Sequence, residues 1–108
     1  ELRFNYCHKS ISGIGVSDED IHRLSHLIRL TKLGLHRLPK VTGATFHSLP
    51  TSLVELDCFD CKIAPENFLY LTRLTKLRKL GVQRELESLE TIINLKEINP
   101  KLKLGYIH

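Results

Sequence analysis

Residues 53–77, LVELDCFDCKIAPENFLYLTRLTKL, contain the pattern that the rest of the chain repeats. Alternate residues of a strand point the same way, so Leu56 and Cys58 are expected to face inward from one strand. Pro65 follows, and its fixed φ suits the first turn of a helix. Apolar residues then recur at a spacing of three, which a helix places along one side: Phe68, Leu71, Leu74 and Leu77. The stretch therefore predicts a strand, a helix and then a second strand that begins near Leu80.

The strand signature of this stretch, leucine-x-leucine, recurs along the chain. It is found at Leu2/Phe4, Leu33/Leu35, Leu56/Cys58, Leu80/Val82 and Leu102/Leu104. The last four pairs are separated by 23, 24 and 22 residues. A period of roughly 20 to 29 is typical of a solenoid, in which each unit packs only against its neighbours. The sequence thus predicts an α/β solenoid of about four repeats plus a final strand, with short parallel strands on a concave face and helices and turns on a convex face.

The units differ in the segments that return from one strand to the next. Leu2 and Leu33 are 31 residues apart, so we expect about seven extra residues in a glycine-containing loop near residues 10–15. Ser17, with Asp20 three residues later, is typical of a helix start. Helices are expected around Ile21, Leu24 and Leu27 and around Leu86, Leu89, Ile92 and Leu95, and a turn is expected at residues 49–52.

These residues resemble the leucine-rich-repeat family, and the most similar subtype is the cysteine-containing one, L-x-x-L-x-L-x-x-C-x-x-I-[ST]-D-x-x-L-x-x-L. The matching positions are Leu2, Phe4 and Cys7, then Val16, Ser17, Asp18, Ile21 and Leu24, and then Leu53, Leu56, Cys58 and Cys61. The units at Leu33 and Leu80 depart from the subtype because they lack a cysteine or asparagine at the ladder slot, the position after the strand whose side chain caps backbone groups. The resemblance implies one leucine-rich-repeat domain over residues 1–108, which we expect to be a fragment of a longer chain.

The same resemblance implies a function. The cysteine-containing subtype is common in F-box proteins, in which the repeats form the substrate-recognition part of a ubiquitin-ligase receptor. Residues 1–108 contain no F-box, so a ligase adaptor would bind through a missing N-terminal segment. The association rests on analogy of fold.

Composition and charge narrow the class of protein. Leucine accounts for 20 of the 108 residues, and methionine and tryptophan are absent, which fits a repeat that refills one buried position with one kind of side chain. The net charge of +4 comes from residues 62–108, which carry nine Lys/Arg against five Asp/Glu, whereas residues 1–61 carry seven of each. A basic bias of this size usually marks a solvated face, but it leaves an acidic protein or nucleic acid open as a partner.

The cysteine usage favours an intracellular protein. Cys7, Cys58 and Cys61 are an odd number, without the paired cysteines expected in the terminal caps of a secreted repeat protein. No apolar run approaches the roughly 18 residues of a membrane span, and the chain has no secretory start. We therefore expect an intracellular location and no membrane segment, with cytoplasm, nucleus and organelle not distinguished.

Several residues have the spacing of a chemical site. Cys58 and Cys61 form a C-x-x-C, which is half of a zinc site or a redox pair, but the repeat assigns Cys58 to a buried strand position and Cys61 to the ladder slot. His22 and His26 lie four residues apart on the expected helix, without a third metal ligand nearby. The acids at residues 18–20 suit the positive end of a helix dipole. No catalytic motif is present, so we expect no enzyme, no metal and no cofactor.

Residues that alternate with the buried leucines should lie on the concave face, which such solenoids use for binding. Those expected there are Arg3, Asn5, Lys32, Gly34, His36, Glu55, Asp57, Phe59, Lys79, Gly81, Gln83, Lys101, Lys103 and Gly105. We expect the partner-binding residues to be Lys32, His36, Glu55, Asp57, Phe59, Lys79 and Gln83. An exposed aromatic such as Phe59 commonly anchors an interface. Gly34, Gly81 and Gly105 should share one column and leave a shallow trough in which Asp57 stands.

The sequence therefore predicts a protein–protein interaction module that binds another protein on its concave face. Two alternatives stay open. One is a structural or assembly subunit of a larger complex without a ligase role, and the other is a nucleic-acid-associated scaffold that uses the basic second half. The first strand has no cap before it, so we also expect further repeats, a cap or a partner on the N-terminal side.

Overall fold

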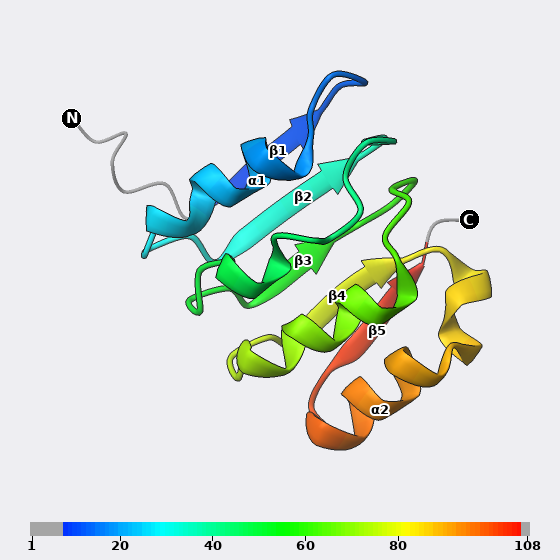
Figure 1. Ribbon diagram of the computed structural model, residues 1–108. Coiled ribbons are helices and arrows are strands. Elements are labelled where there is room, and N and C mark those ends of the chain that lie inside the picture. The colour runs from blue at the N-terminus through cyan, green and yellow to red at the C-terminus, as the bar shows by residue number, and fades with distance from the viewer. Residues whose placement is uncertain (1–7, 107–108) are drawn as a thin grey trace.

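The computed structural model describes residues 8–106, which form one parallel sheet with helices on one side (Figure 1). The strands are β1 (His8–Ser12), β2 (Lys32–His36), β3 (Glu55–Asp57), β4 (Lys79–Val82) and β5 (Lys103–Tyr106). The helical segments are α1 (Asp18–His22), η2 (Arg23–His26), η3 (Phe46–Ser48), η4 (Pro65–Arg73), η5 (Arg84–Ser88) and α2 (Glu90–Ile98), where η denotes a 3₁₀ helix. The strands pair in chain order, β1-β2-β3-β4-β5. The predicted α/β class with parallel strands is confirmed.

The helical segments lie on the same side of the sheet (Figure 1). Each packs against the helical segment of the next unit: α1 contacts η3, η3 contacts η4, and η4 contacts α2. The chain therefore runs in successive turns of strand and helical return, and each turn lies against the next. We call the opposite side of the sheet, which carries no helix within residues 8–106, the open face.

The register across the sheet is nearly uniform. One row of paired residues crosses all five strands: Lys9, Leu33, Leu56, Leu80 and Leu104. Successive members of this row are 24, 23, 24 and 24 residues apart. The repeat is thus more regular than the sequence pattern indicates, because the pattern does not predict β1 and starts the last strand pair two residues too early.

The first unit contains an error in the predicted loop. The prediction of a strand at Leu2 and Phe4 falls outside the described residues. The predicted loop at residues 10–15 is wrong in its first half, because β1 runs to Ser12 and pairs with β2 along its whole length. Ile11 stands beside Leu35 and takes the second apolar position of the strand. The unit therefore needs no insertion before its helix.

The last strand is the second error, because Leu104 rather than Leu102 pairs with Leu80. Leu102 lies in the turn before β5, is 2% exposed and donates its N–H to the carbonyl of Asn99 at 3.0 Å. The side-chain amide of Asn99 donates to the carbonyl of Leu77 at 2.8 Å. Because of this turn, the strand begins two residues later than the leucine spacing predicts.

The core lies between the sheet and the helical layer. It combines inward residues of the strands with apolar residues of the helices, including Leu33, Leu35, Leu56, Leu80, Val82, Ile21, Phe46, Phe68, Leu71 and Ile92, each at most 1% exposed. No polar or charged side chain is buried within the described chain. Burial of each large apolar side chain contributes about 1.5–3 kcal/mol, so this contact between layers holds the repeats together.

The return segments are mostly 3₁₀ rather than α-helical. A 3₁₀ helix has three residues per turn, which is the spacing of Phe68, Leu71 and Leu74. Phe68 and Leu71 lie in η4, Leu74 follows it directly, and all three side chains are buried. The predicted turn at residues 49–52 is confirmed, since η3 ends at Ser48 and the Leu53 N–H donates to the carbonyl of Pro50 at 3.3 Å. None of the helices between residues 8 and 106 is long and apolar enough to cross a membrane.

The predicted helix start at Ser17 is confirmed. Ser17 precedes α1 and donates its N–H to Oδ2 of Asp20 at 3.0 Å. The dipole explanation of Asp18 is incomplete, because its carboxylate also accepts hydrogen bonds from Thr42 and Gly43 of the next unit. Asp18 therefore joins two neighbouring returns.

Candidate functional site

The side chains of the open face fall into columns set by the strand register. The first column contains His8, Lys32, Glu55, Lys79 and Lys103, and the second contains Ser10, Gly34, Asp57, Gly81 and Gly105. The predicted glycine column is therefore confirmed, with Asp57 between Gly34 and Gly81. Arg3 and Asn5, which were also predicted for this face, lie outside the described residues.

Lys32 and Glu55 form an ion pair on this face. Their Nζ and Oε2 atoms are 3.9 Å apart, and the two side chains are 55% and 34% exposed. An exposed pair at this distance contributes about 0–1 kcal/mol. The pair is therefore available to a ligand at little cost in stability.

Asp57 and Phe59 lean from β3 across the neighbouring strand. A Cβ atom added to Gly81 would collide with Oδ1 of Asp57 and would lie 2.7 Å from Cζ of Phe59. Gly81 is accordingly buried although it faces outward. The side chains of Asp57 and Phe59 thus fill the predicted trough at Gly81. Because Gly81 has no side chain, the carboxylate and the ring can lie close to the sheet.

The ring of Phe59 also contacts His36. The two ring centroids are 5.8 Å apart, with an angle of 33° between the planes. Beside them is a hollow of about 410 Å³, which we call the aromatic hollow and which is lined by Ser10, Ser12, His36, Arg37, Phe59 and Asp60. It combines an aromatic surface with hydroxyl, imidazole, guanidinium and carboxylate groups. Such a mixture suits the side chains and backbone of an extended peptide.

The backbone at the rim of this hollow adopts an uncommon conformation. Arg37 and Asp60 have positive φ angles of 57° and 59°, and for residues other than glycine this costs about 1–2 kcal/mol. The Arg37 N–H donates to the carbonyl of Phe59 at 3.1 Å, which extends the pairing of β2 and β3 past the strand ends. This hydrogen bond joins Arg37 to the residue before Asp60, and both charged residues line the hollow.

Sequence reasoning finds only part of this hollow. It identifies His36 and Phe59, but it misses Ser10 and Ser12 because it predicts a loop where β1 lies. It also misses Arg37 and Asp60. Both have left-handed backbone, which a sequence usually indicates by a glycine, and neither residue is glycine. The remaining predicted residues lie elsewhere on the face, with Lys79 in the first column and Gln83 directly after β4. Oε1 of Gln83 is buried and has no hydrogen-bond partner within the described residues.

Cys58 and Cys61 are buried and unpaired, at 1% and 6% exposure. Sγ of Cys61 donates to the carbonyl of Leu35 in the preceding unit at 3.3 Å, which is the contact expected at the ladder slot. Burial raises the pKa of Cys58 well above its ordinary value, and burial likewise raises the pKa of Cys61. Both thiols are thus in an environment that disfavours the thiolate that metal binding and redox chemistry need. No group of three or more potential metal ligands occurs between residues 8 and 106.

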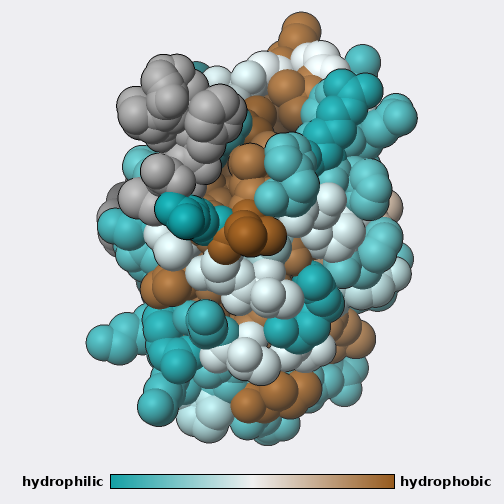
Figure 2. Space-filling view, turned by 90° about the vertical axis from the view of Figure 1, so that its left-hand side faces the viewer, coloured by the Kyte–Doolittle hydropathy of each residue, from teal (hydrophilic) through white to brown (hydrophobic). Residues whose placement is uncertain are grey.

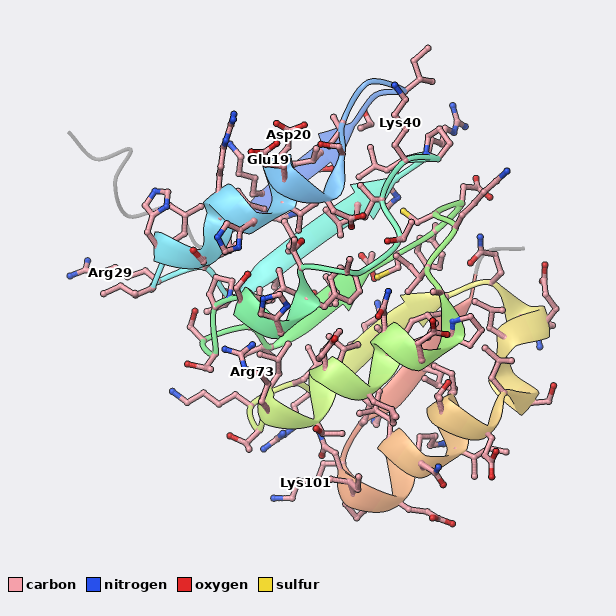
Figure 3. All side chains as sticks on the ribbon, viewed as in Figure 1. Glu19, Asp20, Arg29, Lys40, Arg73 and Lys101 are labelled. Carbon is pink, nitrogen blue, oxygen red and sulfur yellow. The ribbon has the colours of Figure 1, made fainter. Side chains whose placement is uncertain are left out.

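The helical side contains a row of rings. His22 shares a hydrogen bond with Oγ of Ser48, at 2.8 Å from its Nδ1, and its ring centroid is 6.5 Å from that of His47. His47 in turn meets Tyr70 edge-on at 5.5 Å. Arg73 lies at the end of η4 (Figure 3) and donates to the carbonyl of Leu49 at 2.9 Å. These groups link adjacent units, so His22 and Arg73 make structural contacts on the helical side.

Apolar residues also reach the surface outside the open face. Exposed examples are Ile14, Ile28, Leu69, Tyr70, Ile93 and Ile98. Figure 2 shows apolar groups between hydrophilic ones on the side seen there. Scattered apolar residues of this kind are normal for a protein surface.

Comparisons of the chain with protein-family models, with curated proteins and with solved structures gave no match.

Proposed function

We propose that this chain is a leucine-rich-repeat solenoid that binds another protein on its open face. The support for the solenoid is the uniform register of about 24 residues, together with strands and returns that each pack on the next. The cysteine at the ladder slot supports the cysteine-containing subtype, because its thiol bonds to the preceding strand. In this proposal the chain is an intracellular binding module without enzymatic activity.

The aromatic hollow is the observation that carries the binding proposal. The apolar ring of Phe59 is partly exposed in this hollow, and the other lining residues are polar. An aromatic side chain that becomes buried by a partner commonly provides much of the binding energy. Arg37 and Asp60, held at the rim by their backbone conformation, are placed to give the contact its specificity. The ion pair of Lys32 and Glu55 and the side chain of Gln83 would contact the outer parts of the same partner.

Site-specific photo-cross-linking tests the proposed face. A photoreactive phenylalanine analogue replaces either Ser12, which lines the hollow, or Ile93, which is 46% exposed on α2. After illumination in the protein's native cells, we expect a defined cross-linked product from position 12 and none from position 93. A product formed only from position 93 would place the partner on the helical side and overturn the proposal.

The narrower reading, a substrate receptor of a ubiquitin ligase, rests on the resemblance of residues such as Cys58 and Cys61 to the F-box subtype. The full-length protein would then bind a ligase adaptor through a segment outside these residues. A structural or assembly subunit differs in binding its partner without that adaptor. Co-purification of the adaptor with the full-length protein decides between them: its presence at stoichiometric level supports the receptor, and its absence supports the assembly subunit.

A further inference from the structure

A second hollow on the open face is lined almost entirely by cationic residues. It has a volume of about 570 Å³ and is lined by Glu55, Arg78, Lys79, Lys101, Lys103 and Leu104. It lies where β3, β4 and β5 begin, and Figure 3 shows Lys101 in the turn that leads into β5. We call it the cationic hollow. The sequence shows only a diffuse basic excess in residues 62–108, which the fold gathers in one place.

Two lysines of this hollow stand directly side by side. Lys79 and Lys103 are paired positions on β4 and β5, and like charges in such positions destabilise a sheet. A Cβ atom on Gly105 would lie 3.1 Å from Cε of Lys79, so the stem of Lys79 leans over β5 at Gly105, two residues beyond Lys103. Glycine at position 105 permits this approach. Lys79 and Lys103 both line the cationic hollow.

Among the described residues, the positive charges of the hollow have few acidic partners. Its single carboxylate, Glu55, is within 4.0 Å of Lys32, which lies outside the hollow. Within residues 8–106, no ion pair is formed by Lys79, Lys101 or Lys103. The guanidinium of Arg78 donates through Nη1 to the carbonyls of Thr75 and Leu77, each at 3.0 Å, which fixes its position beside the lysines. Four cations thus surround one open volume with one shared acid.

We propose that the cationic hollow binds the dianion of a phosphate monoester. A carboxylate has one charge and is satisfied by one or two cations, whereas a phosphate monoester has a charge of about −1.5 to −2 at neutral pH and three acceptor oxygens. Lysine binds phosphate as a point charge, and three lysines with one arginine provide enough donors for every oxygen. The ligand would relieve the repulsion between Lys79 and Lys103. The site lies on the same face as the proposed partner site, but it does not depend on Phe59 or on the aromatic hollow.

Titration of the 108-residue chain with inorganic phosphate, followed by backbone amide NMR at constant ionic strength, tests the site. We expect saturable shifts at residues 78–79 and 101–105. Lys103→Ala should weaken phosphate binding about tenfold, as expected for loss of one charge-assisted contact. The double variant Lys101→Ala/Lys103→Ala should abolish saturation. Lys96→Ala, an exposed lysine on α2, is the matched control and should bind as the wild type does.

Further probes distinguish the source of the phosphate. A neutral peptide with one phosphoserine should bind more tightly than inorganic phosphate if the monoester belongs to a protein, and equally or more weakly if it is a free small molecule. A single-stranded oligonucleotide, whose phosphodiesters have one charge each, should bind no better than expected from non-specific attraction.

The proposal is overturned if the phosphate shifts are non-saturable or spread over all lysines, or if Lys96→Ala weakens binding as much as Lys103→Ala. It is also overturned if the oligonucleotide binds more tightly than the monoesters with a steep salt dependence. Phe59→Ala should retain phosphate binding, so failure of this site and failure of the proposed partner site are separate results.

Discussion

The carboxylate of Asp18 accepts hydrogen bonds from both the N–H and the hydroxyl of Thr42, at 3.0 and 2.8 Å, although the two residues lie in different repeats. It also accepts the N–H of Gly43 at 3.0 Å. The carbonyl of Thr42 then accepts the side-chain amide of Asn67 at 2.8 Å and the N–H of Ala64 at 2.9 Å. Three successive returns are thus joined through Thr42. These hydrogen bonds therefore add polar contacts between neighbouring returns to the apolar core.

Asp18→Ala should destabilise the fold by about 2–3 kcal/mol, because it leaves two backbone N–H groups without their charged acceptor. Denaturant unfolding measures the loss. Glu19→Ala is the control, since Glu19 is exposed one residue further along α1, and it should change stability by less than about 0.5 kcal/mol. Equal effects of the two variants would mean that the contacts of Asp18 contribute nothing beyond the helix dipole.

Two glycine substitutions should separate folding from binding. Gly81→Ala should leave stability within about 1 kcal/mol, because the atoms that a Cβ would meet are the ends of the Asp57 and Phe59 side chains. It should nevertheless weaken partner binding, since both groups must move. Gly43→Ala should show the reverse. Gly43 has a φ of 88° and close contacts to Ile63 and Asn67, so the strain should cost about 1–3 kcal/mol while the open face remains unchanged. Thermal unfolding and partner titration of both variants provide the comparison.

Cys58 and Cys61 should react slowly with thiol reagents in the native protein. Burial raises the pKa of both thiols, which lowers the thiolate fraction at pH 8, and the thiolate is the reactive form. Site-resolved mass spectrometry after brief alkylation should show little modification of either residue until denaturant is added. Rapid native alkylation of Cys61 would show that the ladder slot is open.

Cys61→Asn should be tolerated, because an asparagine amide can replace the thiol as a donor to the carbonyl of Leu35. Cys58→Val should also fold, since both side chains are small and apolar. Stoichiometric zinc in the purified protein, lost together with the fold in either variant, would replace the structural account with a metal site.

The leucine pattern predicts the sheet, the order of its strands and the column of Gly34, Gly81 and Gly105, because buried strand positions repeat a simple chemical requirement. It fails at β1, where Lys9 takes a position occupied by leucine in the other strands. Lys9 is partly exposed there, and the aliphatic stem of a lysine can cover apolar surface although its head group is charged. Hydropathy alone therefore does not predict β1.

The candidate site is predicted less well than the fold for a related reason. The leaning of Phe59 and Asp57 across Gly81 depends on the strand register and on side-chain packing between repeats. The same holds for the gathering of Arg78, Lys79, Lys101 and Lys103 around one hollow. These residues are distant in sequence, and their spacing has no motif that marks them. Only the three-dimensional arrangement reveals that the basic excess is local.

The affinity of the chain for its cross-linked partner, measured by calorimetry for Phe59→Ala and Tyr70→Ala, tests the central claim most directly. Phe59 lies on the open face, whereas Tyr70 is 41% exposed on the helical side. Loss of a buried interface aromatic commonly costs about 2 kcal/mol or more. We therefore predict that Phe59→Ala weakens binding about thirtyfold with unchanged unfolding, and that Tyr70→Ala leaves the affinity within about twofold. Loss of binding in Tyr70→Ala, with wild-type affinity in Phe59→Ala, would contradict the account.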